Sequence, residues 1–91
     1  MTARVRFFAQ FRERYGAELR IETPPGATVT GVVQEAAGSD RGEESVIGED
    51  GSLRDYVILM KNGRRVEHDE ARQTPAEDGD EIAVFPPVAG G

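Results

Sequence analysis

Segments in which apolar and polar residues alternate lie near both ends of the chain, and alternation with a period of two is typical of half-buried strands. Five segments have this strand character: residues 4–9, 18–23, 56–61, 64–67 and 81–85. Asn62-Gly63 separates the third from the fourth, and this dipeptide favours a two-residue hairpin turn. Asp78-Gly79 precedes the fifth and predicts another turn. The pattern therefore predicts several short strands joined by tight turns.

One stretch, residues 28–37, has helical periodicity instead. Its apolar residues recur at the spacing of a single helix face: Val29, Val32, Val33, Ala36 and Ala37. Thr28 can cap the start of this helix, and Gly38 can close it. Residues 11–15 add at most one helical turn. Because Gly31 and the valines have poor helix propensity, packing against a sheet must stabilise the main helix.

This order of elements predicts an α+β fold with a mixed sheet of four to five strands and one main helix packed across one face. The economical arrangement places the first and last strands side by side and parallel. Strand alternation then directs one set of apolar side chains towards the helix: Val5, Phe7, Leu19, Ile21, Val57, Leu59, Ile82 and Val84. A second set points away from it: Phe8, Ile58, Met60 and Phe85. We interpret the second set as either a partner surface or side chains partly buried under a loop.

Composition narrows the possible functions of this 91-residue chain. It has no cysteine, which excludes a thiol nucleophile, a disulfide framework and a persulfide carrier. Its net charge of −6 argues against direct nucleic-acid binding. There is no apolar run long enough to span a membrane, so we expect a cytoplasmic protein with no membrane contact. Residues 38–52 are polar and glycine-containing, and we expect them to be irregular, partly mobile and poorly anchored.

The last seven residues read Phe85-Pro86-Pro87-Val88-Ala89-Gly90-Gly91. Proline cannot continue a sheet ladder, so Pro86 and Pro87 are expected to lead the chain out of the sheet. We therefore divide the chain into a domain at residues 1–85 and an exposed tail at residues 86–91. Val88, Ala89 and Gly90 would thread into a partner and present the Gly91 carboxylate. A frayed terminus is the alternative.

Several landmarks occur in an order that resembles a known family. They are residues 5–13 (VRFFAQFRE), Ala27-Thr28-Val29, Leu53-Arg54-Asp55, Asn62-Gly63, Thr74-Pro75, residues 78–81 (DGDE) and residues 85–91 (FPPVAGG). Together they resemble the ubiquitin-like β-grasp proteins represented by MoaD, the small subunit of molybdopterin synthase, by ThiS, and by the archaeal small modifier proteins. The resemblance spans nearly the whole chain and implies a β-grasp fold.

The resemblance implies a carrier with no catalysis of its own. A ubiquitin-activating-type enzyme would use ATP to adenylate the Gly91 carboxylate, and the chain itself would bind no cofactor. As a sulfur carrier, it would then bear a thiocarboxylate that donates sulfur in molybdopterin (molybdenum cofactor) biosynthesis, with the large subunit of molybdopterin synthase as partner. Phe8 and Phe85 resemble that family's hydrophobic contact positions, and Ile58 and Met60 share their face.

Two other functions stay open. The chain could be a small modifier joined through an isopeptide bond at Gly91 to lysines of target proteins, with a further use in tRNA thiolation. It could also be a binding module whose terminal glycines are incidental. His68 lies in a charged stretch and is expected to be exposed, with no metal site. Lys61, the only lysine, is expected to be a solvated charge at a strand end, and the acidic residues 77–81 are expected to form a turn.

Overall fold

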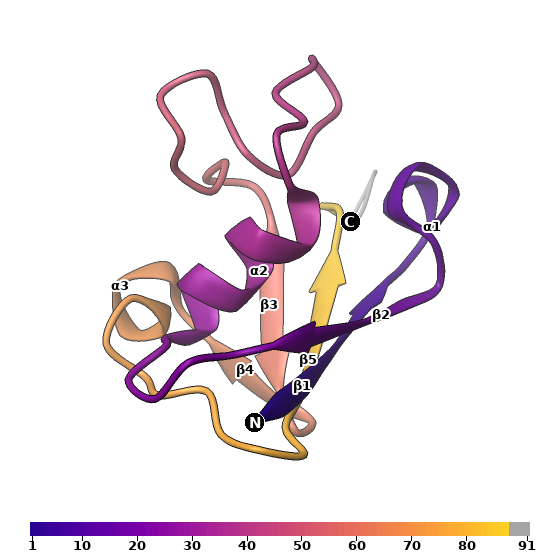
Figure 1. The fold of residues 1–91 in the computed structure, drawn as a ribbon. Coiled ribbons are helices and arrows are strands. Elements are labelled where there is room, and N and C mark those ends of the chain that lie inside the picture. The colour runs from indigo at the N-terminus through magenta and orange to yellow at the C-terminus, as the bar shows by residue number, and fades with distance from the viewer. Residues whose placement is uncertain (88–91) are drawn as a thin grey trace.

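The computed structural model describes residues 1–87. Its elements, drawn in Figure 1, are β1 (Thr2–Phe7), α1 (Gln10–Tyr15), β2 (Glu18–Glu22), α2 (Val29–Ala37), β3 (Ile58–Lys61), β4 (Arg64–Val66), α3 (His68–Ala71) and β5 (Glu81–Phe85). Within residues 1–87, no helix is long and apolar enough to cross a membrane.

The strands form one five-stranded sheet in the order β2-β1-β5-β3-β4. β1 and β5 pair in parallel at the centre, and the other three pairings are antiparallel. The predicted α+β fold, mixed sheet and parallel first and last strands are therefore confirmed. Because β1 and β5 are parallel neighbours, Phe7 lies opposite Val84 and both strands end on the same side of the sheet.

The helix α2 covers one face of the sheet (Figure 1). The Thr28 Oγ1 accepts a hydrogen bond from the Gly31 N–H at 3.1 Å, which satisfies one of the unpaired donors in the first turn. All five apolar residues predicted for its inner face are buried. The strand residues predicted to face α2 are buried as well, except that Leu19 and Ile21 are half-buried at the edge of the core. The predicted division of the two sheet faces is thus confirmed for the core side.

The hairpin between β3 and β4 turns at Asn62 and Gly63, as predicted. Both residues have positive φ angles, 51° and 86°, and Lys61 lies opposite Arg64 across the turn. Positive φ at both central positions is the requirement of a type I′ turn, whose twist matches that of the strands. The Asp78-Gly79 turn is also formed, and the Gly79 N–H donates to the Thr2 carbonyl at 2.9 Å.

Two expectations about charged side chains were wrong. His68 opens α3, a helix not predicted from the sequence, and is half-buried because the Ala71 side of this turn packs into the core. Its Nε2 N–H donates to the Val57 carbonyl at 2.6 Å. Lys61 is not a freely solvated charge: its Nζ lies 3.5 Å from Asp80 Oδ2 and donates to the Pro75 carbonyl at 3.2 Å.

Candidate docking and transfer site

The strand β5 leads the chain from the sheet centre to the candidate site. The Val84 carbonyl accepts a hydrogen bond from the Phe8 N–H at 3.2 Å, so the segment after β1 is tied to the end of β5. Phe85 is the last strand residue, and Pro86 and Pro87 follow it, half-buried and exposed. The remaining predicted tail residues, Val88, Ala89, Gly90 and Gly91, lie outside the described residues, and their roles stay predictions.

An aromatic pair lies at the base of this tail. The Phe8 and Phe85 rings stack with centroids 4.3 Å apart and planes 12° from parallel. The Arg6 guanidinium lies over the Phe8 ring, 5.2 Å from its centroid, within the range of a cation–π contact. Two rings that support each other at the surface give a rigid apolar anchor, which is the kind of group that contributes most to binding at protein interfaces.

The other two predicted contact residues come from β3. Ile58 lies opposite Phe85 in the antiparallel β3–β5 pairing, and Met60 lies opposite Ala83 two residues further. Since alternate residues share a face, all of these side chains project from the face opposite α2. Phe8, Ile58, Met60 and Phe85 are each half-buried. The structure thus brings the four predicted residues together, and their role in docking stays a prediction.

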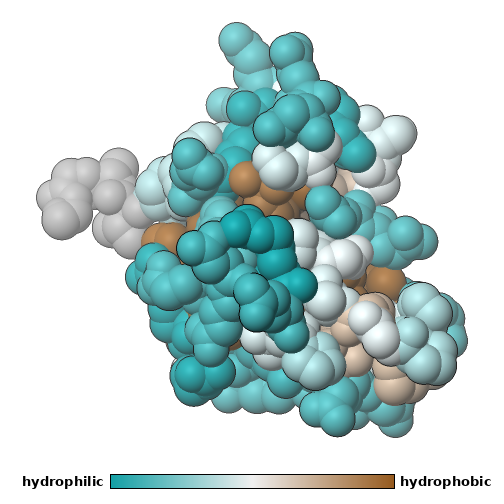
Figure 2. Space-filling view, turned by 90° about the vertical axis from the view of Figure 1, so that its left-hand side faces the viewer, coloured by the Kyte–Doolittle hydropathy of each residue, from teal (hydrophilic) through white to brown (hydrophobic). Residues whose placement is uncertain are grey.

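Charged side chains surround this apolar group. Glu81 Oε atoms lie 3.4 Å from Arg4 and 3.6 Å from Arg6, and the side chains of both arginines are more than two-fifths exposed. Exposed ion pairs of this kind add little to stability, so Arg4, Arg6 and Glu81 can exchange these pairings for contacts with a partner at little cost. Figure 2 shows a neighbouring side of the molecule, where the surface is mostly hydrophilic and hydrophobic residues appear only in small patches. An apolar centre with a polar rim is the usual anatomy of an interface.

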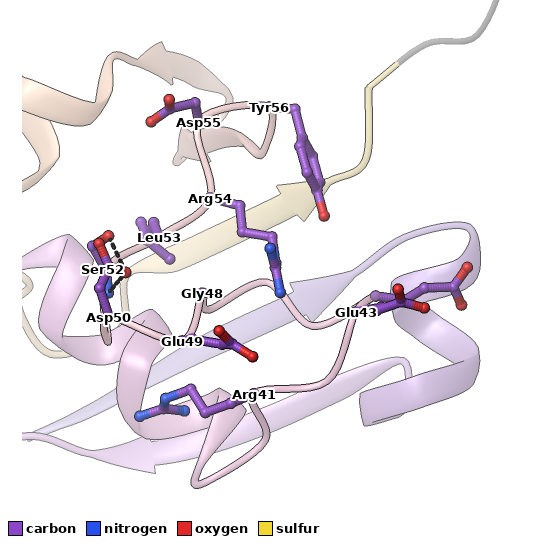
Figure 3. A pocket seen from close by; sticks show the side chains of 11 residues that line it. Arg41, Glu43, Gly48, Glu49, Asp50, Ser52, Leu53, Arg54, Asp55 and Tyr56 are labelled. Carbon is purple, nitrogen blue, oxygen red and sulfur yellow. Dashed lines mark hydrogen bonds between the residues drawn. The ribbon is translucent and has the colours of Figure 1, made fainter.

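Two hollows share Glu44 and Tyr56 in their walls, and the smaller of them lies at the base of the tail. The smaller, about 190 Å³, includes Pro87 in its wall, together with Gln10, Phe11, Glu44 and Tyr56. The larger, about 960 Å³, is formed by the segment between α2 and β3 and is shown in Figure 3. Its acidic lining residues, Glu43, Glu44, Glu49, Asp50 and Asp55, outnumber Arg41 and Arg54. The larger hollow is therefore acidic, whereas among residues 1–87 Glu44 is the one acidic residue that lines the smaller hollow at Pro87.

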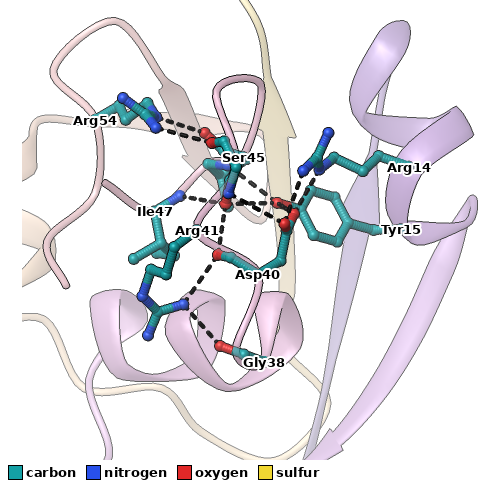
Figure 4. A network of polar contacts seen from close by, with 10 residues as sticks. Arg14, Tyr15, Gly38, Asp40, Arg41, Ser45, Ile47 and Arg54 are labelled. Atoms are coloured by element: carbon teal, nitrogen blue, oxygen red, sulfur yellow. Dashed lines mark hydrogen bonds and ion pairs between the residues drawn. The ribbon is translucent and has the colours of Figure 1, made fainter. Parts of the chain in front are cut away.

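A polar network that the sequence did not reveal anchors the segment after α2 (Figure 4). The Tyr15 hydroxyl donates to Asp40 Oδ2 at 2.7 Å and accepts the Val46 N–H at 3.0 Å. Arg54 donates to the carbonyls of Ser45 and Gly42 at 2.8 and 2.9 Å. The Arg14 guanidinium pairs with Asp40 and, with the Tyr15 bond, holds the pKa of that carboxyl well below its usual range. Burial raises the pKa of Tyr15 above its ordinary value.

The expectation that residues 38–52 are poorly anchored was therefore wrong, although the segment is irregular as predicted. Val46 and Ile47 are completely buried and belong to the main core. Two consecutive apolar residues in an otherwise polar stretch were the available signal, since burying them offsets the entropy of ordering the loop.

The predicted acidic turn has a structural role at Asp80. This carboxylate is buried and accepts hydrogen bonds from Asn62 Nδ2 at 3.0 Å and from the Glu77 N–H at 2.7 Å. Burial raises the pKa of Asp80, but these hydrogen bonds and the nearby Lys61 ammonium together outweigh it and leave the pKa below the ordinary value. Among residues 1–87, no group of three or more His, Asp or Glu side chains is placed to hold a metal ion.

Comparison with known proteins identifies the family. A model described as the ThiS family matches residues 5–91. The chain belongs to the ThiS family. It is 39% identical to small archaeal modifier protein 3 of Haloferax volcanii, over the full length of both chains. It is 40% identical to the molybdopterin synthase sulfur carrier subunit of Escherichia coli, over 97% of this chain and 98% of that protein. The resemblance predicted from the sequence landmarks is thus confirmed.

Solved structures confirm the ubiquitin-like β-grasp fold of this ThiS-family chain. The crystal structure of SAMP1 from Haloferax volcanii superposes with a TM-score of 0.78 at 29% identity, covering all of both chains. A complex of subunits 1 and 2 of the molybdopterin-converting factor from Helicobacter pylori contains a chain with a TM-score of 0.61, fully covered by this one. At 22% identity, that second likeness concerns the fold alone. The chain is therefore a ubiquitin-like sulfur carrier or modifier by family.

Proposed function

We propose that this chain is a sulfur carrier of the MoaD type, activated at the Gly91 carboxylate and serving molybdopterin biosynthesis. The observation that carries the proposal is the stacked pair of Phe8 and Phe85 at the point where β5 ends and the tail begins. This aromatic pair would give a partner a rigid apolar contact next to the tail that carries the Gly91 carboxylate. The identity to the sulfur carrier subunit of Escherichia coli, which extends over nearly the whole chain, supports the same assignment.

The chemistry that this proposal requires is activation of a carboxylate. A carboxylate is a poor electrophile until one oxygen is converted into a good leaving group. A ubiquitin-activating-type enzyme would transfer AMP from ATP to Gly91 and release pyrophosphate. Sulfide from a donor would then attack the carbonyl and displace AMP, and loss of the S–H proton would leave a thiocarboxylate. The chain has no cysteine to supply that sulfur itself, so the donor is external.

The proposed acceptor is the large subunit of molybdopterin synthase. The face formed by Phe8, Ile58, Met60 and Phe85 would bind it, and Pro86 and Pro87 would direct residues 88–91 into its active site. The 40% identity to the molybdopterin synthase sulfur carrier subunit of Escherichia coli motivates this choice of partner. The acidic hollow formed by residues 41–56 would favour partners with basic surfaces.

A second function is favoured by the end-to-end identity of 39% to a small archaeal modifier protein. In this alternative, the same adenylate passes Gly91 to a lysine amine of a target protein and forms an isopeptide bond. Use of the thiocarboxylate in tRNA thiolation would be a further branch. All of these routes share the activation step, and they differ in the nucleophile that attacks the activated carbonyl.

Intact mass spectrometry of the protein from its own host, under conditions that preserve thiocarboxylates, tests the proposal. The expected result is a species in which one oxygen is replaced by sulfur. Its absence from cells that are making molybdenum cofactor would overturn the sulfur-carrier assignment. Tryptic digestion of the same cells tests the alternative: Arg72 is the last cleavage site, so a modified lysine would carry residues 73–91 as a remnant.

A further inference from the structure

The strand β2 forms one edge of the sheet. Among residues 1–87 it pairs with β1 only. At the two ends of this antiparallel pairing, the Phe7 N–H donates to the Ala17 carbonyl at 3.1 Å and the Thr23 N–H donates to the Met1 carbonyl at 2.8 Å. Hydrogen-bonded pairs alternate along such a ladder. It follows that Leu19 and Ile21 use their backbone groups for β1.

The intervening β2 residues direct their N–H and C=O groups away from the sheet. These residues are Glu18, Arg20 and Glu22, and all three are exposed. An edge with free, regularly spaced donors and acceptors is a template for another strand. The sheet can therefore be extended on this side without breaking a bond that it already has.

A groove runs beside this edge, between β2 and α2. It has a volume of about 280 Å³, and its apolar walls come from Ile21, Pro24, Ala27 and Val32. Gly31 leaves its helix side open, because a Cβ placed there would meet only Thr28 Oγ1, at 3.4 Å. Since Ile21 projects to the α2 side, alternate side chains of a strand added to β2 would project into the same groove.

The rim of the groove determines which segment fits it. Its charged lining residues are Glu22 and Glu35, both exposed, and no basic residue lines it. The Glu22 carboxylate accepts the Thr2 hydroxyl on the face away from α2, so the charge on the groove side is that of Glu35. The Arg20 side chain lies opposite Arg4 and so belongs to the face away from α2. Charge complementarity therefore favours apolar residues flanked by lysine or arginine.

We propose that the β2 edge and the adjoining groove bind an extended segment of another protein, in which small apolar residues alternate along the strand and basic residues flank them. The segment adds a strand to β2 through the backbone groups of Arg20 and Glu22, and its apolar side chains fill the groove. Backbone pairing supplies affinity and the groove supplies specificity in this mode of recognition. The site is independent of the proposed transfer function, because Phe8 and Phe85 lie on the opposite sheet face.

The test is a two-dimensional NMR titration of the intact protein with the synthetic peptide Lys-Lys-Val-Thr-Val-Thr-Lys-Lys. The expected result is a saturable shift of the amides of Arg20, Glu22 and the groove residues, with Phe8 and Phe85 unaffected. Shifts confined to the Phe8–Phe85 face, or no saturable shift, would overturn the proposal. A peptide with glutamate in place of lysine is expected to bind at least tenfold more weakly, about the effect of 1.4 kcal/mol.

Two matched pairs of variants separate backbone pairing from charge. Arg20→Pro removes one outward N–H that β1 does not use, and proline is tolerated on sheet edges. Arg20→Ala removes the same side chain but keeps the donor. We expect only the proline variant to lose peptide binding, and equal affinities of the two would contradict β2 pairing.

Glu35→Lys is expected to weaken binding of the peptide, whereas Glu49→Lys, an exposed change outside the groove, is expected to leave the binding unchanged.

Discussion

The hydroxyl of Tyr15 donates a hydrogen bond of 2.7 Å to Asp40, a residue 25 positions later in the chain. Tyr15 belongs to α1, and Asp40 belongs to the segment between α2 and β3. The same hydroxyl accepts a hydrogen bond from the Val46 N–H. The Tyr15 oxygen therefore links α1 to two points of the segment after α2, Asp40 and Val46. Because Gln10 and Phe11 of α1 and Glu44 of the segment line the hollow that contains Pro87, this bond also shapes the surface beside the tail.

The substitution Tyr15→Phe tests this link. The ring can keep its stacking on Phe7, whose centroid is 4.7 Å away, while Asp40 and the Val46 N–H lose a partner. We expect the free energy of unfolding to fall by about 1–3 kcal/mol, as for a buried group left unsatisfied. Urea unfolding measures it. Tyr56→Phe is the control, since Tyr56 is 43% exposed, and we expect a change within about 0.5 kcal/mol. Equal effects of the two substitutions would contradict the anchoring role of Tyr15.

We expect the ionisation of Asp80 to make the stability of the fold depend on pH. Its folded pKa is below the ordinary value of 3.8, so the folded state binds fewer protons than the unfolded state in this range. Its contribution is therefore present above pH 3.8 and is lost as the pH falls through the folded pKa. We expect Asp80→Asn to be less stable than the unmodified protein at neutral pH, with the gap shrinking below pH 3.8. Thermal unfolding of both proteins between neutral pH and pH 2 measures this difference in stability. A difference that did not change with pH would contradict the prediction.

Much of the fold could be predicted from the sequence because local patterns and long-range pairing agree. Asn62-Gly63 specifies a turn by its own backbone preferences, and alternation specifies which side of β5 faces α2. The candidate contact residues followed from the same alternation: Ile58 and Phe85 are predicted on one face and are cross-strand partners in the structure.

The anchoring of the segment after α2 could not be predicted in this way. Tyr15 and Asp40 have no periodic relation, and their bond exists only because the core positions α1 beside that segment. The helix α3 escaped prediction for a related reason. Its four residues are too few to show a helical period, and Ala71 is buried by tertiary packing alone. Irregular structure depends on individual contacts that only the folded chain brings together.

Phe85→Asp is expected to disrupt docking to the partner without unfolding the domain. The side chain is half-buried on the open sheet face, so a carboxylate there reaches water in the free protein but is desolvated in a complex. We expect binding to the large subunit of molybdopterin synthase to weaken by at least about 30-fold, the effect of losing a hot spot of about 2 kcal/mol. Titration calorimetry measures it, with Phe85→Leu as the apolar control. Unchanged affinity of Phe85→Asp would refute the docking assignment.

Deletion of Gly91 separates activation from docking. The shortened chain ends in Gly90, so its carboxylate has the same chemistry but falls short of the activating enzyme's nucleotide by one extended residue, roughly 3.3 to 3.6 Å. We expect ATP–pyrophosphate exchange with that enzyme to be abolished, because in-line attack tolerates little displacement. Binding to the large subunit through Phe8 and Phe85 should change much less than exchange does.

If exchange persisted at the normal rate, the Gly91 carboxylate would not be the reacting group, and the terminal glycines would be incidental to a binding module. If exchange and docking were lost together, the tail would contribute to docking itself, and Phe85 alone would not account for recognition.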